Sequence, residues 1–520
     1  MSDNNWKTYP AANQIKQETN PAVEIYGLRF HGDQTLYEYL IEFLLVFASA
    51  KNADHTGKMD FHSYDPLQKT EYYVEPREGF RRFIFYAQAM KGRVQADEVA
   101  YREIITVLKK HIQGNNEKKK EEFLFAVQEL FRGYAAVLKK RTWCAQELLP
   151  MCPEMILCEQ MPNDTFRKKG PQDTWEKKCG VEVLRGSFDR DATFYDASFE
   201  LTKHNFLARG GEMYYLHLLQ AMQNQDDTRE RLRLALTNLL TSKSEQFTEL
   251  ANWIQNTWVR EKNIDPECLY RRMQMGYLPA GSYEWSGHYA VKELLNFLSN
   301  ELHPVKRVEL LAKGTMFQIL RMLLDRTSEY LGAEPFPVIV DMRSRKGGTI
   351  IRQLSVESLN QISDAFVSAI NQCVVKRRGA AEPDKEAEYS AFIKAKKESL
   401  DVFRAKGKEL QFIIPMKGPY ERFSLSEDLL RFLVLSLVRP GTSMDLNHFL
   451  ESLYKHYRIV IGPNEYVKSV QDNSTDKGYV NSFSYNLDAF QRFLKAAGFL
   501  RDLSDATSIV VNPYEEVLLG

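Results

Sequence analysis

The chain has 520 residues, of which 44% are hydrophobic and 27% are charged, and its 69 basic residues are balanced by 69 acidic residues. This composition predicts a folded protein of several domains and excludes a disordered chain. Because the formal charge is zero, no global field draws the molecule onto nucleic acid or an anionic membrane. Any such contact must come from a local patch.

No segment of the sequence has the pattern of a membrane span. The most apolar stretch, 36–50, contains Glu38 and Glu42 and is shorter than the roughly 20 residues needed to cross a bilayer. The N-terminus lacks the basic and apolar regions of a secretory signal. Six cysteines without a dense framework favour a reducing compartment. The sequence therefore predicts a cytoplasmic protein without membrane contact.

Hydrophobic residues recur at helical spacing along most of the chain, which predicts a mainly α, multi-domain protein with small β-hairpin insertions. Polar or proline-containing stretches between the helical stripes mark the expected boundaries. The expected segments are a flexible tail (1–22), an N-terminal helical domain (23–143), an irregular connector (144–199), a central helical domain (200–334), a hairpin with helices and a charged linker (335–419), and a winged-helix-like domain (420–520).

The loop at 51–66 and the cysteines after it carry side chains that can bind metals. Neither group has the spacing of a metal site: HExxH is absent, and no two cysteines are two to four residues apart. Surface polarity and buried apolar cysteines are the favoured interpretations, and no metal site is predicted. The residues concerned are His55, Asp60, His62 and Asp65 in the loop, and Cys144, Cys152, Cys158 and Cys179.

The stretch "FLARGGEMYYLHLL" (206–219) predicts a helix that begins at Gly210 and Gly211. Backbone N–H groups at such a helix start, together with Arg209, favour an anion, so a phosphate of nucleic acid or nucleotide is one interpretation. In the favoured alternative, the glycines only permit a tight turn before the helix, while Glu212 complements the helix dipole and pairs with Arg209.

The stretch "PFPVIVDMRSRKGGTIIRQLS" (335–355) has β-branched residues on both sides of a Gly-Gly pair and predicts a hairpin. Its tip would be a basic finger suited to a phosphate backbone, and "CVVKRRG" (373–379) would extend that surface if the fold brings the two together. The favoured alternative is a solvated hairpin tip and a charged linker. The candidate contact residues are Arg343, Arg345, Lys346, Lys376, Arg377 and Arg378.

The last hundred residues have the pattern of a winged helix. Helices are expected at 426–438, 445–457 and 486–499, followed by a two-stranded wing across "SDAT". A DNA-reading version needs a basic third helix, but this one offers only Arg492 and Lys495. With ten basic and thirteen acidic residues, the domain is mildly acidic, which favours protein docking or a structural role over DNA reading.

Several stretches resemble helical proteins encoded in bacterial anti-phage defence clusters. The resemblance implies a subunit of a multi-protein system that acts on foreign DNA beside an ATPase, a nuclease or a methyltransferase. It carries over no catalytic residue. The stretches are "YLIEFLLVFASAKN", "RFIFYAQ", "LLPMCPE", "FLARGGEMYYLHLL" and "FLKAAGFLRDLSDATSIVVNPY".

No phosphate loop, dinucleotide fingerprint, nucleophile elbow or deaminase motif is present in the sequence, so no catalytic residue and no cofactor is predicted. The leading hypothesis is a non-enzymatic accessory or scaffold subunit of a defence complex that docks a partner protein and presents DNA through residues 343–346. Two alternatives stay open. One is a DNA-binding or transcriptional regulatory protein, and the other is a metal-dependent nuclease centred on residues 55–65.

Overall fold

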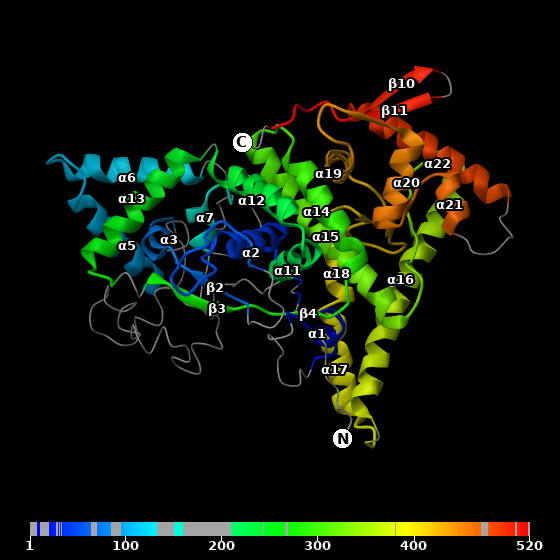
Figure 1. Ribbon diagram of the computed structural model, residues 1–520, viewed down its shortest axis with the longest axis horizontal. Coiled ribbons are helices and arrows are strands. Elements are labelled where there is room, and N and C mark those ends of the chain that lie inside the picture. The colour runs from blue at the N-terminus through cyan, green and yellow to red at the C-terminus, as the bar shows by residue number, and fades with distance from the viewer. Residues whose placement is uncertain are drawn as a thin grey trace.

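The protein is mainly α-helical in this computed structural model, and the described part of the chain contains only small sheets of two or three strands. Figure 1 shows the N-terminal helices at one end of the molecule and the last helices and strands at the other. No described helix is long and apolar enough to cross a membrane. The described residues are 8–10, 20–27, 30, 32, 34–63, 70–84, 95–132, 150–159, 210–242, 244–265, 269–379, 381–469, 477–504 and 507–517.

The N-terminal and central helices form one body with two small sheets across it. Strand β1 (Thr8–Tyr9) pairs antiparallel with β4 (Leu278–Pro279), and β2 (Glu71–Val74) pairs antiparallel with β3 (Arg271–Gln274). The helices are α1 (Pro21–Tyr26), α2 (Leu36–Ala48), α3 (Glu78–Ile84), α5 (Gln95–Lys110), α6 (Glu117–Arg132), α7 (Pro153–Leu157), α11 (Gly210–Ala221), α12 (Asp226–Thr241), α13 (Glu245–Glu261), α14 (Glu284–Leu298) and α15 (Pro304–Leu331).

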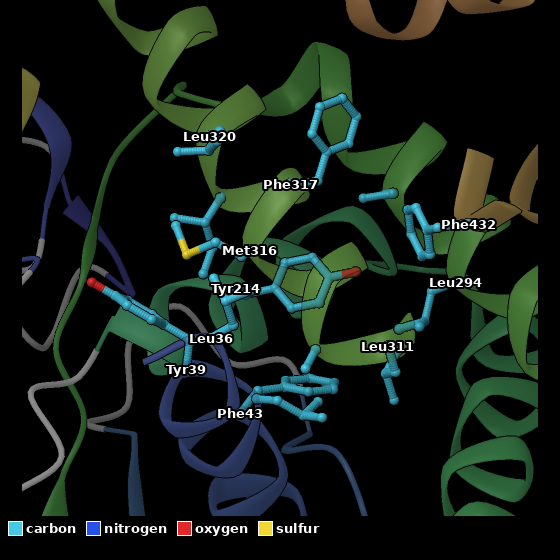
Figure 2. Packing of buried hydrophobic residues seen from close by; sticks show 14 of the residues in the cluster. Leu36, Tyr39, Phe43, Tyr214, Leu294, Leu311, Met316, Phe317, Leu320 and Phe432 are labelled. Atoms are coloured by element: carbon cyan, nitrogen blue, oxygen red, sulfur yellow. The ribbon is translucent and has the colours of Figure 1, made fainter. Parts of the chain in front are cut away.

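Helix α2 lies at the centre of this body. It begins with a capping box, in which Thr35 Oγ1 accepts from Glu38 N at 3.3 Å and Glu38 Oε2 accepts from Thr35 N at 2.6 Å. The helix is buried nearly all round, as its apolar sequence predicts. Its Tyr39 and Phe43 pack beside Tyr214 of α11, and α15 covers the same cluster (Figure 2).

The segment after residue 335 is helical where the sequence predicted a hairpin. Short β5 (Val338–Ile339) leads into a loop, and α16 (Gly348–Arg378) then begins directly after Gly347, so the hairpin prediction is wrong. The reason is that the apolar residues from Ile351 to Cys373 recur at helical spacing and line the buried face of α16. Two further helices and an antiparallel strand pair follow, namely α17 (Lys385–Lys397), α18 (Leu400–Glu409), and β6 (Ile413–Ile414) with β7 (Arg422–Phe423).

The C-terminal segment is a winged helix. Its three main helices are α19, α20 and α22, with the short α21 between the last two, and its antiparallel sheet has the order β10-β11-β8, in which the β10–β11 pair is the predicted wing. After α20, β9 pairs in parallel with β5 and so joins the winged helix to the preceding segment. The elements are α19 (Glu427–Leu437), β8 (Ser443–Asp445), α20 (Leu446–Tyr457), β9 (Ile459–Val460), α21 (Pro463–Ser469), α22 (Lys477–Ala496), β10 (Leu500–Ser504) and β11 (Thr507–Val511).

Some polar side chains are buried where α11, α14 and α15 meet. The ring of His217 is fully enclosed, packs edge-on against Tyr283, and has no hydrogen-bond partner at either nitrogen among the described residues. Burial, with a smaller contribution from the nearby Arg321, lowers the pKa of His217 to about 3. The folded protein therefore keeps this imidazole neutral.

Replacing His217 by phenylalanine should make the protein less sensitive to acid. Because the folded pKa lies below the unfolded value of about 6.5, the unfolded chain binds the extra proton, and stability is lost as pH falls below that value. Each pH unit below 6.5 lowers the free energy of unfolding of the wild type by about 1.4 kcal/mol. Between pH 7.5 and pH 5, His217→Phe should therefore gain about 2 kcal/mol in free energy of unfolding relative to the wild type. Thermal unfolding at both pH values measures this, and an equal pH response of the two proteins would contradict it.

Candidate nucleic-acid interface

Residues 343–346, called the basic loop below, connect β5 to α16 and lie against α22, the third helix of the winged helix. The Nζ atom of Lys346 is 5.9 Å from the ring centre of Tyr485 on α22. A Cβ atom at Gly347 would lie 3.0 Å from Ser482 Cα, so the end of the loop touches the α22 backbone. Figure 1 shows the start of α16 beside this end of the winged helix. The structure thus brings the basic loop and α22 together.

A buried asparagine of α22 fixes the base of the loop. Asn486 Oδ1 accepts a hydrogen bond from Met342 N at 2.9 Å. Its Nδ2 donates to Val340 O and to Ile461 O, both at 3.0 Å. The side chain of Asn486 is fully buried, so these bonds are shielded from water and join β5, β9 and α22 at one point.

A buried carboxylate holds the loop itself. Asp341 Oδ1 accepts from Arg343 N at 2.7 Å, and Asp341 Oδ2 accepts from Arg422 Nε at 2.7 Å. Arg343 adopts a left-handed backbone with φ of 57°, which few residues other than glycine adopt without support. The carboxylate of Asp341 therefore fixes the turn at which the three basic side chains leave the fold.

The basic side chains of the loop, Arg343, Arg345 and Lys346, are exposed, and none of them forms an ion pair with a described residue. Arg492, on the exposed face of α22, is likewise without an ion pair in the described chain. Lys495 differs, because its Nζ lies 2.7 Å from Asp502 Oδ2 and its charge is largely offset.

Sequence reasoning passed over two further exposed residues, one on α22 and one on the wing. Tyr485 lies seven residues before Arg492, which places both on the same side of α22, and its ring is 40% exposed. Arg501, on β10 of the wing, is exposed and has no ion pair with a described residue. Asp488, which lies between Tyr485 and Arg492 in α22, is an exposed carboxylate. Helical spacing would have grouped Tyr485 with Arg492, but no local signal places the basic loop beside them.

The second basic segment lies elsewhere. Residues 376–378 form the last turn of α16, and about 30 residues at 1.5 Å each put them roughly 45 Å from the basic loop. Arg377 Nε pairs with Glu24, and Arg378 Nη1 lies 3.4 Å from Glu388 Oε1. Lys376 is exposed in the same turn. The fold therefore does not bring the two basic segments together into one surface, because the helix between them is continuous.

The glycines at the start of α11 serve helix packing. A Cβ atom at Gly211 would lie 2.2 Å from Tyr39 O and 2.7 Å from Phe43 N, and one at Gly210 would lie 2.2 Å from the Tyr39 ring. The N–H of Gly211 donates to Glu42 Oε2 at 2.5 Å, so an internal carboxylate already occupies the position predicted for a phosphate. The predicted anion site is thus filled from within, and Arg209 lies outside the described residues.

The loop at 51–63 gives no support to a metal centre. His62 Nδ1 lies 2.9 Å from Tyr215 Oη and its Nε2 lies 2.7 Å from Glu71 O, so both ring nitrogens have protein partners. His55 stacks on Tyr270 with ring centres 3.7 Å apart. Asp60 Oδ1 accepts from the N–H of Phe61. Asp65 lies outside the described residues.

No group of three or more metal-binding side chains occurs among the described residues. Two of the four cysteines considered in the sequence lie among the described residues. Cys152 and Cys158 are buried, and burial raises the pKa of the Cys152 thiol to about 12. Cys144 and Cys179 lie outside the described residues.

Comparisons with protein-family models, with curated proteins and with solved structures gave no match. Function must therefore be inferred from the surface formed by the basic loop, α22 and the wing.

Proposed function

We propose that this protein is a non-enzymatic accessory subunit that contacts DNA through the basic loop and the exposed face of α22. The observation that carries the proposal is the set of exposed, unpaired cations in a loop held rigidly against the third helix of a winged helix. The resemblance in the sequence suggests that the complex it serves is a bacterial anti-phage defence system, with an ATPase, nuclease or methyltransferase as partner.

Rigidity and charge support this assignment. Unpaired Arg and Lys side chains gain free energy by releasing counterions from phosphates, whereas cations already held in ion pairs gain much less. Residues 343, 345 and 346 have no ion pair with a described residue, and the backbone beneath them is fixed by Asn486 and Asp341, so little ordering entropy is lost on binding. Tyr485 adds an exposed ring beside Lys346 that suits contact with sugar or base.

The mild acidity of the winged helix does not oppose this proposal. The acidic residues counted in the sequence include several that are held in internal pairs, among them Asp428 with Lys313 and Glu421 with Lys408. The loop contributes cations from outside the 420–520 segment, which the sequence count leaves out. The count for the 420–520 segment alone therefore does not give the charge of the surface that the basic loop and α22 share.

The test is DNA binding by the purified full chain across about 50 to 300 mM salt, with Arg343→Glu/Arg345→Glu/Lys346→Glu beside the wild type. Because each phosphate contact adds about one to the slope of log affinity against log salt, the variant should lose about three in slope and at least about 100-fold in affinity.

The matched control is Lys119→Glu/Arg231→Glu/Lys292→Glu, which makes the same change in net charge at exposed cations of α6, α12 and α14 that have no ion pair with described residues. It should bind like the wild type apart from a small general loss. If the two triple variants lose affinity equally, or the wild type does not bind at the lowest salt, the proposal is overturned. Cleavage of DNA or hydrolysis of nucleotide by the chain alone would refute the non-enzymatic part.

A further inference from the structure

The C-terminal half of α16 and the antiparallel α17 form an arm that projects from the body, at the end of α16 remote from α22 (Figure 1). Two large apolar side chains are exposed on α17, Tyr389 at 67% and Ile393 at 44%. They lie four residues apart and so share one side of the helix. Together they form a small contiguous apolar patch on the exposed side of α17.

Tyr389 and Ile393 do not belong to the side of α17 that packs against the body. Ala395 is fully buried, Phe392 packs against the main core, and Glu388 pairs with Arg378 of α16. At 100° per residue, these three define a face that points away from Ile393. The outward face carries Glu386, Tyr389, Ser390, Ile393 and Lys397, at the spacing of one stripe of a coiled coil.

The charges at the two ends of this stripe are of opposite sign and have no ion pair among the described residues. Glu386 is exposed in the first turn of α17, and Lys397 is exposed at its last residue. The helix dipole favours this order of charges in any helix. It does not explain why two apolar residues lie exposed between them.

We propose that α17 is the contact surface for a second copy of this chain, with the two helices packed antiparallel about a two-fold axis. When the axis passes between residues 391 and 392, Glu386 of each copy faces Lys397 of the other. In the same register, Ser390 faces Ile393 of the partner, and Tyr389 faces Lys394 of the partner. A self-complementary stripe of this kind is what an isologous dimer requires.

The arrangement makes a second copy the fitting occupant. An antiparallel pair of identical helices matches the opposite charges at the two ends twice, once on each side of the axis, and covers both apolar residues of each copy. The paired length is 13 residues, about 20 Å, which makes a small interface, so the dimer should be weak, with a dissociation constant in the micromolar range.

Sedimentation velocity of the full chain at about 5 to 100 μM tests the proposal, using Glu386→Lys and Lys397→Glu separately and mixed. Each single variant places like charges opposite each other in its own dimer and should remain monomeric, with the dissociation constant raised at least about tenfold. The equimolar mixture should dimerise, because the lysine introduced by Glu386→Lys then faces the glutamate introduced by Lys397→Glu, and the unchanged Lys397 of the first chain faces the unchanged Glu386 of the second. The double variant Glu386→Lys/Lys397→Glu should dimerise alone.

A second variant, Tyr389→Ser/Ile393→Ser, removes the apolar centre from two exposed positions and should be monomeric with an unchanged melting temperature. The inference is overturned if the wild type stays monomeric across the range. It is also overturned if the single variants dimerise like the wild type, or if their mixture stays monomeric.

Discussion

Replacing Gly211 by alanine is expected to destabilise the protein by about 3 kcal/mol or more, a large effect for the addition of one methyl group. The added Cβ atom would lie 2.2 Å from Tyr39 O and 2.7 Å from Phe43 N. Both are backbone atoms of α2, so no side-chain rotation relieves the contact. Helix α11 would have to move away from α2 and break the hydrogen bond from Gly211 N to Glu42.

Thermal and denaturant unfolding of Gly211→Ala measure this loss, with Gly348→Ala as the matched control. Gly348 also begins a helix, but no atom lies within 4 Å of the position of its Cβ atom, so its replacement should change stability by no more than about 0.5 kcal/mol. An unfolding temperature of Gly211→Ala equal to that of the wild type would contradict the conclusion that the close approach of α2 and α11 requires a glycine at position 211.

The winged helix was predictable because its signals are local. The side chain of Ser426 accepts from Leu429 N, and that of Asp445 accepts from Asn447 N. Both residues therefore cap the helices that begin where the sequence predicted. The turn "SDAT" before the β-branched stretch "SIVVN" likewise predicted the wing. Strand β8 was not predicted, because it is three residues long and is defined only by its pairing with β11.

The region after residue 335 shows why short apolar runs mislead. Ile350 and Ile351 beside two glycines suggested a strand, yet the same residues continue the stripe of a 31-residue helix. The stretch 335–355 ends too soon after the glycines to show the helical period. The longer run through Leu359, Ile362 and Phe366 reveals helical spacing.

The candidate interface could be predicted only in part. The basic character of residues 343–346 is visible in the sequence, but their place beside α22 depends on the hydrogen bond from Met342 N to Asn486, which are 144 residues apart. A buried asparagine has no local signature, since its role comes from the carbonyl groups that surround it. The same holds for Glu42, which fills the N-terminus of α11 from another helix.

The substitution Arg321→Met breaks the ion pair between Glu293 of α14 and Arg321 of α15. It is expected to lower the free energy of unfolding by about 3 to 5 kcal/mol, because the buried charge of Glu293 then remains without its partner. Arg321 Nη1 lies 3.1 Å from Glu293 Oε1 and also donates to His456 O of α20 at 3.2 Å. Glu293 Oε1 lies 2.6 Å from His456 Nδ1 as well. The cluster therefore joins the winged helix to the central helices, and both charged side chains are almost fully buried.

The pH dependence of Arg321→Met follows from the same contacts. Burial alone would raise the pKa of Glu293, but Arg321 and His456 outweigh it and the pKa is lowered. In the wild type, the ionised carboxylate of Glu293 therefore stabilises the folded protein at pH values above its unfolded pKa. This stabilisation is lost as the pH falls. Without Arg321 the folded pKa should rise above the unfolded value, so the folded state binds the extra proton and stability falls as pH rises.

The deficit of Arg321→Met relative to the wild type should therefore be larger at pH 8 than at pH 5, as measured by thermal unfolding at both values. Glu293→Met/Arg321→Met is the informative control. It removes both charges and fills the space with apolar groups, so it should be less destabilised than Arg321→Met, with a deficit that varies little with pH. A double variant less stable than Arg321→Met would mean that hydrogen bonds to Gln318 and His456, rather than the uncompensated charge, dominate the loss.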